Sequence, residues 1–149
     1  MRLSLDPPRR VDAYGFCHRL RVRFAETDAM GIVHHASYLL YLEEARVEYL
    51  RAVGHPYLGV RAEGVDFAVL EVAVQYLAPL RFDDEVELHV LLAAVTGATF
   101  QLAYLLTLDG RPVATAVTVH GGLTPQGRPA RLPGWLRDLA TDSAGGTEQ

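Results

Sequence analysis

The spacing of apolar and polar positions divides the chain into one long helix and several strands. Residues 17–25 alternate strictly, with Leu20, Val22 and Phe24 on one side and three arginines on the other, which is typical of a half-buried strand. Residues 37–52 repeat apolar side chains at three- and four-residue steps and predict a helix. The opposite side of this helix also carries Leu39, Leu40, Val47 and Leu50. We therefore expect a helix that is deeply wrapped or touched by a partner subunit.

The chain turns to β structure from Val65 onward. Four further strands are predicted, at residues 67–77, 85–95, 99–108 and 113–121. Turn residues separate them, and Asp109-Gly110 is a strong signal for a tight hairpin. Because short connections favour antiparallel neighbours, the order β-α-β-β-β-β predicts an α+β domain in which one long helix packs against a curved, five-stranded antiparallel sheet.

The remaining segments have weaker patterns. Residues 1–16 are predicted as an N-terminal extension, residues 17–140 as the folded domain, and residues 141–149 as a C-terminal tail expected to be disordered. Within the domain, residues 55–64 are expected to form a mixed connection, and residues 135–140 a short helix.

Composition narrows the class of protein. A chain of 149 residues is long enough for one domain, and its formal net charge of -4 gives no basic surface of the kind that binds nucleic acid. Cys17 is the only cysteine, which excludes an intrachain disulfide. No stretch predicts a signal peptide or a membrane span, and we expect a cytoplasmic protein.

The candidate chemistry lies between the first strand and the helix. Asp28 is in a loop several residues ahead of the helix, and Gly31 allows that loop to turn tightly or to approach a ligand. An ordinary aspartate at this place would cap the helix, but here the cap is expected at His35 or Ser37. A carboxylate ahead of a helix whose first N–H groups lack partners is suited to cleaving a thioester.

Other kinds of site are disfavoured. The adjacent residues His34 and His35 are expected to diverge, and no further ligand pair accompanies them, so no metal site is predicted. His89 and His120 are isolated in strands, where packing or surface exposure is the expected role. The chain has no nucleophile elbow, and Cys17 has no convincing histidine partner near it in sequence, which leaves carboxylate chemistry.

Three segments carry a resemblance to a known family. The runs RFAETDAMGIVHHASYLLYLEEARVEYLR, VQYLAPLRFDDEVEL and RPARLPGWL resemble hotdog-fold acyl-CoA thioesterases of the 4-hydroxybenzoyl-CoA thioesterase family, particularly its YbgC-like branch. The similarity covers residues 18–137 and includes a motif formed by Asp28, Gly31, Val33, His35 and Tyr38. It implies a single hotdog domain, with protomers joined edge to edge into a homodimer and then a dimer of dimers, a homotetramer.

The resemblance also implies roles for these residues. Asp28 would attack the thioester carbonyl or activate a water for that attack, and both roles stay open. The backbone N–H of His35 would hold the oxyanion at the positive end of the helix. The substrate-binding set implied by the motif is Gly31, Val33, His34 and Tyr38. No cofactor is expected beyond the coenzyme A that forms part of the substrate.

The expected coenzyme A contacts depart from the family pattern. Where some relatives have a basic cluster after the third long strand, residues 93–99 contain no arginine or lysine. Arg128 and Arg131 are therefore the candidate contacts for the nucleotide. Acyl carrier protein as the thioester carrier, a hotdog dehydratase or hydratase, and a non-catalytic acyl-thioester binding protein remain as alternatives.

Overall fold

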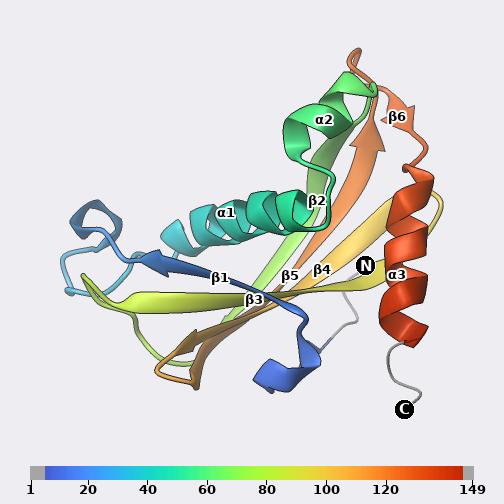
Figure 1. The fold of residues 1–149 in the computed structure, drawn as a ribbon. Helices are drawn as coiled ribbons and strands as arrows, with labels where there is room; N and C mark the ends of the chain where they lie inside the picture. Colours follow the sequence, from blue (N-terminus) through green and yellow to red (C-terminus); the bar gives the residue numbers. More distant parts are fainter. Residues whose placement is uncertain (1–5, 146–149) are drawn as a thin grey trace.

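The predicted long helix lies across one face of a curved antiparallel sheet (Figure 1). The structure, a computed structural model, describes residues 6–145, and the helix is α1 (Ser37–Ala52). The sheet consists of β1 (Phe16–Arg21), β2 (Asp66–Tyr76), β3 (Glu85–Val95), β4 (Thr99–Leu108), β5 (Arg111–Leu123) and the short β6 (Pro129–Ala130). The helix and the five long strands were predicted, and β6 adds a sixth.

The strand order corrects one predicted pairing. The order is β1-β3-β4-β5-β2, with β6 paired to β5. The two tight hairpins, β3–β4 and β4–β5, form as predicted, and Asp109 and Gly110 both adopt the positive φ that such a turn requires. Strands β2 and β3 are not neighbours, because residues 77–84 carry the chain across the end of α1 instead of folding back. Leu80 in this crossing is buried, and its carbonyl accepts the N–H of Val33 at 2.8 Å.

The main core lies between α1 and the inner face of the sheet. The buried helix residues are Tyr38, Tyr41, Leu42, Ala45, Tyr49 and Leu50, and they face a row on β3 formed by Val86, Leu88, Val90 and Leu92. Leu50, on the second apolar side of the helix, is 1% exposed, as expected for a helix that is deeply wrapped. The sheet curves far enough around the helix to cover this wider arc. Leu40, by contrast, is 57% exposed.

The N-terminal segment covers part of the other face of the sheet. Figure 1 shows η1 (Val11–Ala13) on the side of the sheet away from α1. The Tyr14 ring packs on Ala103 and Leu105, and its hydroxyl donates to the Pro8 carbonyl at 2.7 Å. Residues 6–15 are thus held against the domain, and Phe16 is already the first residue of β1. Residues 1–5 lie outside the described chain.

Two predicted boundaries are wrong by several residues. The first strand ends at Arg21, because the chain then enters the turn η2 (Phe24–Glu26) and leaves Phe24 76% exposed. The expected mixed connection contains a helix, α2 (Tyr57–Ala62), whose Val60 is buried.

The second wrong boundary is at the C-terminal end. Helix α3 (Gly134–Gly145) continues past residue 140, so residues 141–145 of the predicted tail are helical, and residues 146–149 lie outside the described chain. Packing of its first turns, through Trp135, Leu136 and Leu139, nucleates a helix that then propagates past its apolar residues. Across residues 6–145 no helix combines the length and apolar character needed to span a membrane.

Candidate active site

The loop that carries Asp28 is closed by backbone hydrogen bonds. The Asp28 N–H donates to the Ile32 carbonyl and the Gly31 N–H donates to the Asp28 carbonyl, both at 2.9 Å. Gly31 has a φ of 78°, in the left-handed region that favours glycine, so this residue makes the tight turn possible. Asp28 Oδ1 accepts the Met30 N–H at 2.9 Å, and Oδ2 has no hydrogen-bond partner within residues 6–145. One carboxylate oxygen thus orients the group, and the other is without a partner among residues 6–145.

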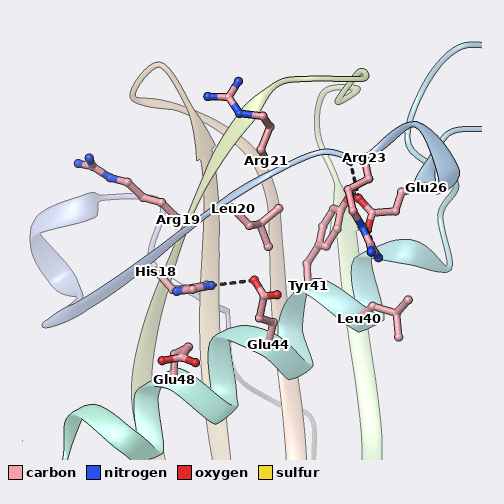
Figure 2. Close-up of a pocket in the computed structure, with 10 residues that line it drawn as sticks. All are labelled: His18, Arg19, Leu20, Arg21, Arg23, Glu26, Leu40, Tyr41, Glu44 and Glu48. Atoms are coloured by element: carbon pink, nitrogen blue, oxygen red, sulfur yellow. Dashed lines mark hydrogen bonds and ion pairs between the residues drawn. The ribbon is translucent and has the colours of Figure 1, made fainter.

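Glu26 anchors this loop to α1. Its carboxylate accepts the hydroxyl of Tyr41 at 2.8 Å, the N–H of Arg23 at 2.8 Å and the guanidinium Nε of Arg23 at 2.9 Å. Its carbonyl accepts the N–H of His34 at 2.8 Å. Figure 2 shows the Glu26 side chain between the end of β1 and the first turns of α1. Both ends of the Asp28 loop are therefore fixed to one buried acid.

The charge on Glu26 is stabilised by these contacts. Burial alone would raise the pKa of Glu26, but the hydrogen bonds from Arg23 and Tyr41, together with the Arg23 charge, hold it below the ordinary value. The same pairing, added to burial, raises the pKa of Tyr41, which stays a hydrogen-bond donor. Sequence reasoning did not select Glu26, because nothing in the spacing of residues 26 and 41 shows that they meet.

The entrance of α1 differs from the prediction in two respects. The N-cap residue is Ala36, without a side-chain cap, whereas His35 or Ser37 was expected. His34 Nδ1 instead accepts the Ala36 N–H at 3.1 Å. The rings of His34 and His35 do not diverge but stack, with their centroids 4.2 Å apart. The His35 N–H has no hydrogen-bond acceptor in the described part of the chain, so this donor is available at the positive end of the helix.

Four of the eight predicted site residues line one cavity. The cavity has a volume of about 500 Å³ and is lined by Asp28, Met30, Ile32, Val33, His35, Tyr38, Tyr76, Leu77, Ala78 and Pro79. Four of the predicted residues, Asp28, Val33, His35 and Tyr38, are therefore brought together. Gly31 and His34 shape the loop beside the cavity without lining it.

Tyr76 is a further residue of this cavity that sequence reasoning did not select. Its hydroxyl donates to the His35 carbonyl at 2.9 Å, and its ring meets the Tyr38 ring edge-to-face with centroids 4.9 Å apart. Burial raises the pKa of Tyr38, which keeps this wall neutral. Tyr76 thus holds the peptide that follows the candidate oxyanion donor.

Two arginine side chains line an adjoining cavity. Arg81 and Arg111 line a space of about 320 Å³ that shares Ala78 and Pro79 with the Asp28 cavity. The predicted contacts Arg128 and Arg131 line neither cavity; they are exposed and flank β6. Arg81 and Arg111 could be predicted only from the strand order. Arg81 lies in the crossing of residues 77–84, and only in this topology does the crossing reach the β4–β5 turn, which Arg111 follows.

His89 and His120 are both packed in the interior. His120 lies under α1, where its Nε2 is 2.7 Å from Thr118 Oγ1 and its ring stacks on Phe100. Burial, with a contribution from the Arg46 charge, lowers the pKa of His120 to about 3. Packing, rather than surface exposure, is therefore the outcome for both residues.

Comparison with known proteins identifies the family. The family model of the thioesterase-like superfamily matches residues 22–139. The chain belongs to the thioesterase-like superfamily. An Aquifex aeolicus protein, a candidate esterase by its name, is 43% identical over 105 residues, which are 70% of this chain and 82% of that protein. The acyl-CoA thioester hydrolase YbgC of Escherichia coli is 39% identical over 80 residues, which are 54% of this chain and 60% of YbgC.

A solved structure agrees with this membership. A thioesterase from Thermus thermophilus, solved in complex with coenzyme A and Zn, has a TM-score of 0.77 at 29% identity, and the match covers 90% of this chain and 97% of that one. The predicted hotdog architecture and the predicted class of enzyme, a thioester hydrolase, are confirmed. Acyl-CoA thioesterase activity is supported at the level of the family.

Proposed function

We propose that this protein hydrolyses an acyl-CoA thioester to a free acid and coenzyme A in the Asp28 cavity. The observation that carries the proposal is that Asp28 and His35 line one cavity, with a carboxylate oxygen and a helix N-terminal N–H both free of other partners among residues 6–145. The largely apolar wall formed by Met30, Ile32 and Val33 suits an acyl group.

The reaction requires attack on the thioester carbonyl carbon and departure of the coenzyme A thiolate. The Asp28 carboxylate attacks the carbonyl carbon to give a mixed anhydride that water then hydrolyses, or it takes a proton from an attacking water; both routes fit the geometry. The His35 N–H donates to the oxygen on which negative charge develops. The C–S bond then breaks, and the coenzyme A thiolate leaves and takes up a proton.

Arg81 and Arg111 are our proposed contacts for the phosphates of coenzyme A. They line the cavity that adjoins the acyl-binding one, whereas Arg128 and Arg131 line neither. Guanidinium groups bind phosphates through paired, charge-assisted hydrogen bonds.

The proposed assembly is a homodimer joined along β2 and, above it, a dimer of dimers. β2 is an edge strand of the sheet, and it carries exposed apolar residues: Val69, Leu70, Val72 and Tyr76. An edge of this kind is a template for pairing with another chain, and a second copy supplies an identical edge. Leu39 on α1 lines a cavity with Val69 and Val72 and extends the same exposed apolar surface.

A panel of acyl thioesters tests the function. Aliphatic and aromatic acyl groups, each carried on coenzyme A and on acyl carrier protein, are incubated with the wild type and with Asp28→Ala. We expect hydrolysis by the wild type and a loss of about a hundredfold or more in the variant. Equal turnover by the two proteins would remove Asp28 from the mechanism. Hydration of an enoyl thioester without hydrolysis, or tight binding without turnover, would instead favour the two alternative functions.

A further inference from the structure

A second group of reactive side chains lies on the face of the sheet away from α1. Cys17 on β1 is directly opposite His89 on β3 in the strand register, and Glu87 lies two residues before His89 on the same face. The ligand atoms of Cys17, Glu87 and His89 all lie within 4.8 Å of one another. Cys17 Sγ is 3.9 Å from Glu87 Oε2, which in turn is 3.8 Å from His89 Nε2.

We propose that Cys17, Glu87 and His89 form a binding site for a divalent transition-metal ion, with Zn²⁺ as the best-fitting ion. Thiolate, imidazole and carboxylate are the three ligand types that Zn²⁺ takes in proteins, whereas Mg²⁺ and Ca²⁺ disfavour sulfur. Metal–ligand distances of about 2.0–2.3 Å place tetrahedral ligands roughly 3.3–3.6 Å apart. The Cys17–Glu87 pair at 3.9 Å and the Glu87–His89 pair at 3.8 Å therefore need to close by a few tenths of an ångström, and the Cys17–His89 pair, which lies within 4.8 Å, by no more than about 1.5 Å. Three protein ligands leave the fourth position to water.

The surroundings of the three side chains fit this role. His89 is 3% exposed, and its Nε2, which lies toward Glu87, is also 3.1 Å from the hydroxyl of Thr107, a contact that Nε2 exchanges for the ion when the metal binds. Arg19 lies 3.8 Å from the other oxygen of Glu87 and leaves Oε2 for the ion. Cys17 is exposed, which gives the ion a path from solvent.

Metal binding is coupled to the release of one proton, that of the Cys17 thiol. A metal ion binds cysteine as the thiolate, so binding releases the thiol proton to solvent, and the thiolate and carboxylate then neutralise the two positive charges. Because the ligands come from the paired strands β1 and β3, the ion would fasten the edge strand that leads to the Asp28 loop.

Titration of the full chain with Co²⁺ is the decisive experiment. Co²⁺ occupies tetrahedral zinc sites, and a bound thiolate adds a sulfur-to-cobalt charge-transfer band in the near ultraviolet. Since Cys17 is the only cysteine of the chain, this band reports on one residue. We expect the band to saturate at one Co²⁺ per chain and to vanish when Zn²⁺, which binds such ligands more tightly than Co²⁺, is added.

Variants assign the ligands. Cys17→Ser should abolish the band, and Glu87→Gln should weaken Co²⁺ binding about tenfold to a hundredfold or more, since even outer-shell partners are worth that much. His18→Gln is the matched control. His18 is the next residue of β1, but Figure 2 shows it pointing to Glu44 of α1, with Nε2 2.7 Å from Oε2. The control should bind Co²⁺ like the wild type.

Two results would overturn the proposal. One is the absence of a charge-transfer band at stoichiometric Co²⁺, and the other is equal affinity in the wild type and Glu87→Gln, which would indicate a cysteine binding metal unaided. His89→Gln changes a buried residue and can itself disturb folding. The test therefore relies on Glu87→Gln, because Glu87 is only half-buried. As an independent readout, Zn²⁺ should raise the Tm of the wild type and leave that of Glu87→Gln nearly unchanged, because a ligand stabilises only the state that binds it.

Discussion

Glu26 and Asp28 are two acids only two positions apart, yet they have opposite environments. Glu26 is 7% exposed, and its carboxylate accepts three hydrogen bonds from Arg23 and Tyr41. Asp28 is half-buried at a cavity, and one of its oxygens has no partner among residues 6–145. A fully satisfied buried acid holds a structure together, whereas an acid with an unused oxygen beside a cavity is available for a reaction.

The comparison also explains how one loop combines rigidity with reactivity. The Glu26 carbonyl and carboxylate hold the loop at both ends, so that Asp28 needs only the Met30 N–H to fix its direction. Catalytic groups need precise placement, and Glu26 would supply that placement for Asp28, the proposed catalytic group. Changes at the two acids should therefore separate activity from stability.

The largest effect is expected for Asp28→Asn. The amide has nearly the same shape but is neither a nucleophile nor a base, so kcat/KM for the best acyl thioester should fall about a hundredfold or more. The free energy of unfolding should change by less than about 0.5 kcal/mol, since a single Asx-type hydrogen bond to Met30 is retained. Kinetics and urea unfolding on the same preparation measure both. A large loss of stability would show that Asp28 acts as a loop anchor.

Glu26→Ala should produce the reverse pattern. The change leaves the Tyr41 hydroxyl and the Arg23 N–H without their acceptor, and a hydrogen bond to a charged group is worth about 1.5–3 kcal/mol. We expect urea unfolding to show a loss of stability of that order, with residual hydrolysis that is still abolished by adding Asp28→Ala. Glu48→Ala, which removes an acid paired to Arg51 on the surface of α1, is the control and should change stability by under about 1 kcal/mol.

His120 adds a third case to the comparison of the two acids. It is a buried polar group that burial keeps neutral in the folded chain. Burial holds its pKa at about 3 in the folded chain, whereas the unfolded chain takes up the proton near the ordinary value of 6.5. Below that value the unfolded state binds one more proton, so stability should fall as pH falls, by about 1.4 kcal/mol per pH unit. Glu26, with its lowered pKa, loses its contribution only as the pH falls below the ordinary value of 4.5.

Urea unfolding between about pH 7.5 and 5, which spans the ordinary pKa of histidine, checks this slope. His89, whose pKa burial also lowers, acts in the same direction, so the difference between the wild type and His120→Gln isolates His120. The variant should have the shallower slope. Equal slopes would mean that the pKa of His120 is the same in the folded and unfolded chains.

Local sequence patterns predicted the long helix and the five long strands but not the contacts between distant ones. The three- and four-residue apolar steps gave α1, and Asp109-Gly110 gave its hairpin, because each depends only on neighbours along the chain. The place of β2 at the far edge depends on how residues 77–84 cross α1, which no local signal encodes. For the same reason the pairing of Cys17 with His89 appears only once the register of β1 and β3 is known.

The candidate site shows the same division. Asp28, Gly31 and His35 lie within one short stretch, so their motif predicts a common cavity, and Asp28 and His35 do line one. Tyr76 and Arg81 reach the site from the β2 end and the crossing that follows it, and their sequence context is that of ordinary strand and loop residues. Arg128 and Arg131 are predicted as nucleotide contacts from their charge alone. Their charge does not indicate where β6, which they flank, lies relative to the cavity.

The smallest effect is expected for Tyr76→Phe, which tests how finely the His35 peptide must be held. The hydroxyl donates to the His35 carbonyl at 2.9 Å, while the ring also packs on Tyr38 and is retained in phenylalanine. One hydrogen bond of this kind is worth about 0.5–1.5 kcal/mol, so kcat should fall roughly twofold to tenfold, with KM for the acyl group little changed. Stability should stay near that of the wild type, because Tyr76 is exposed and water can replace its hydroxyl as a donor. A fall in kcat without a fall in Tm would show that Tyr76, like Asp28, affects activity. A fall in Tm without a fall in kcat would show that Tyr76, like Glu26, affects stability.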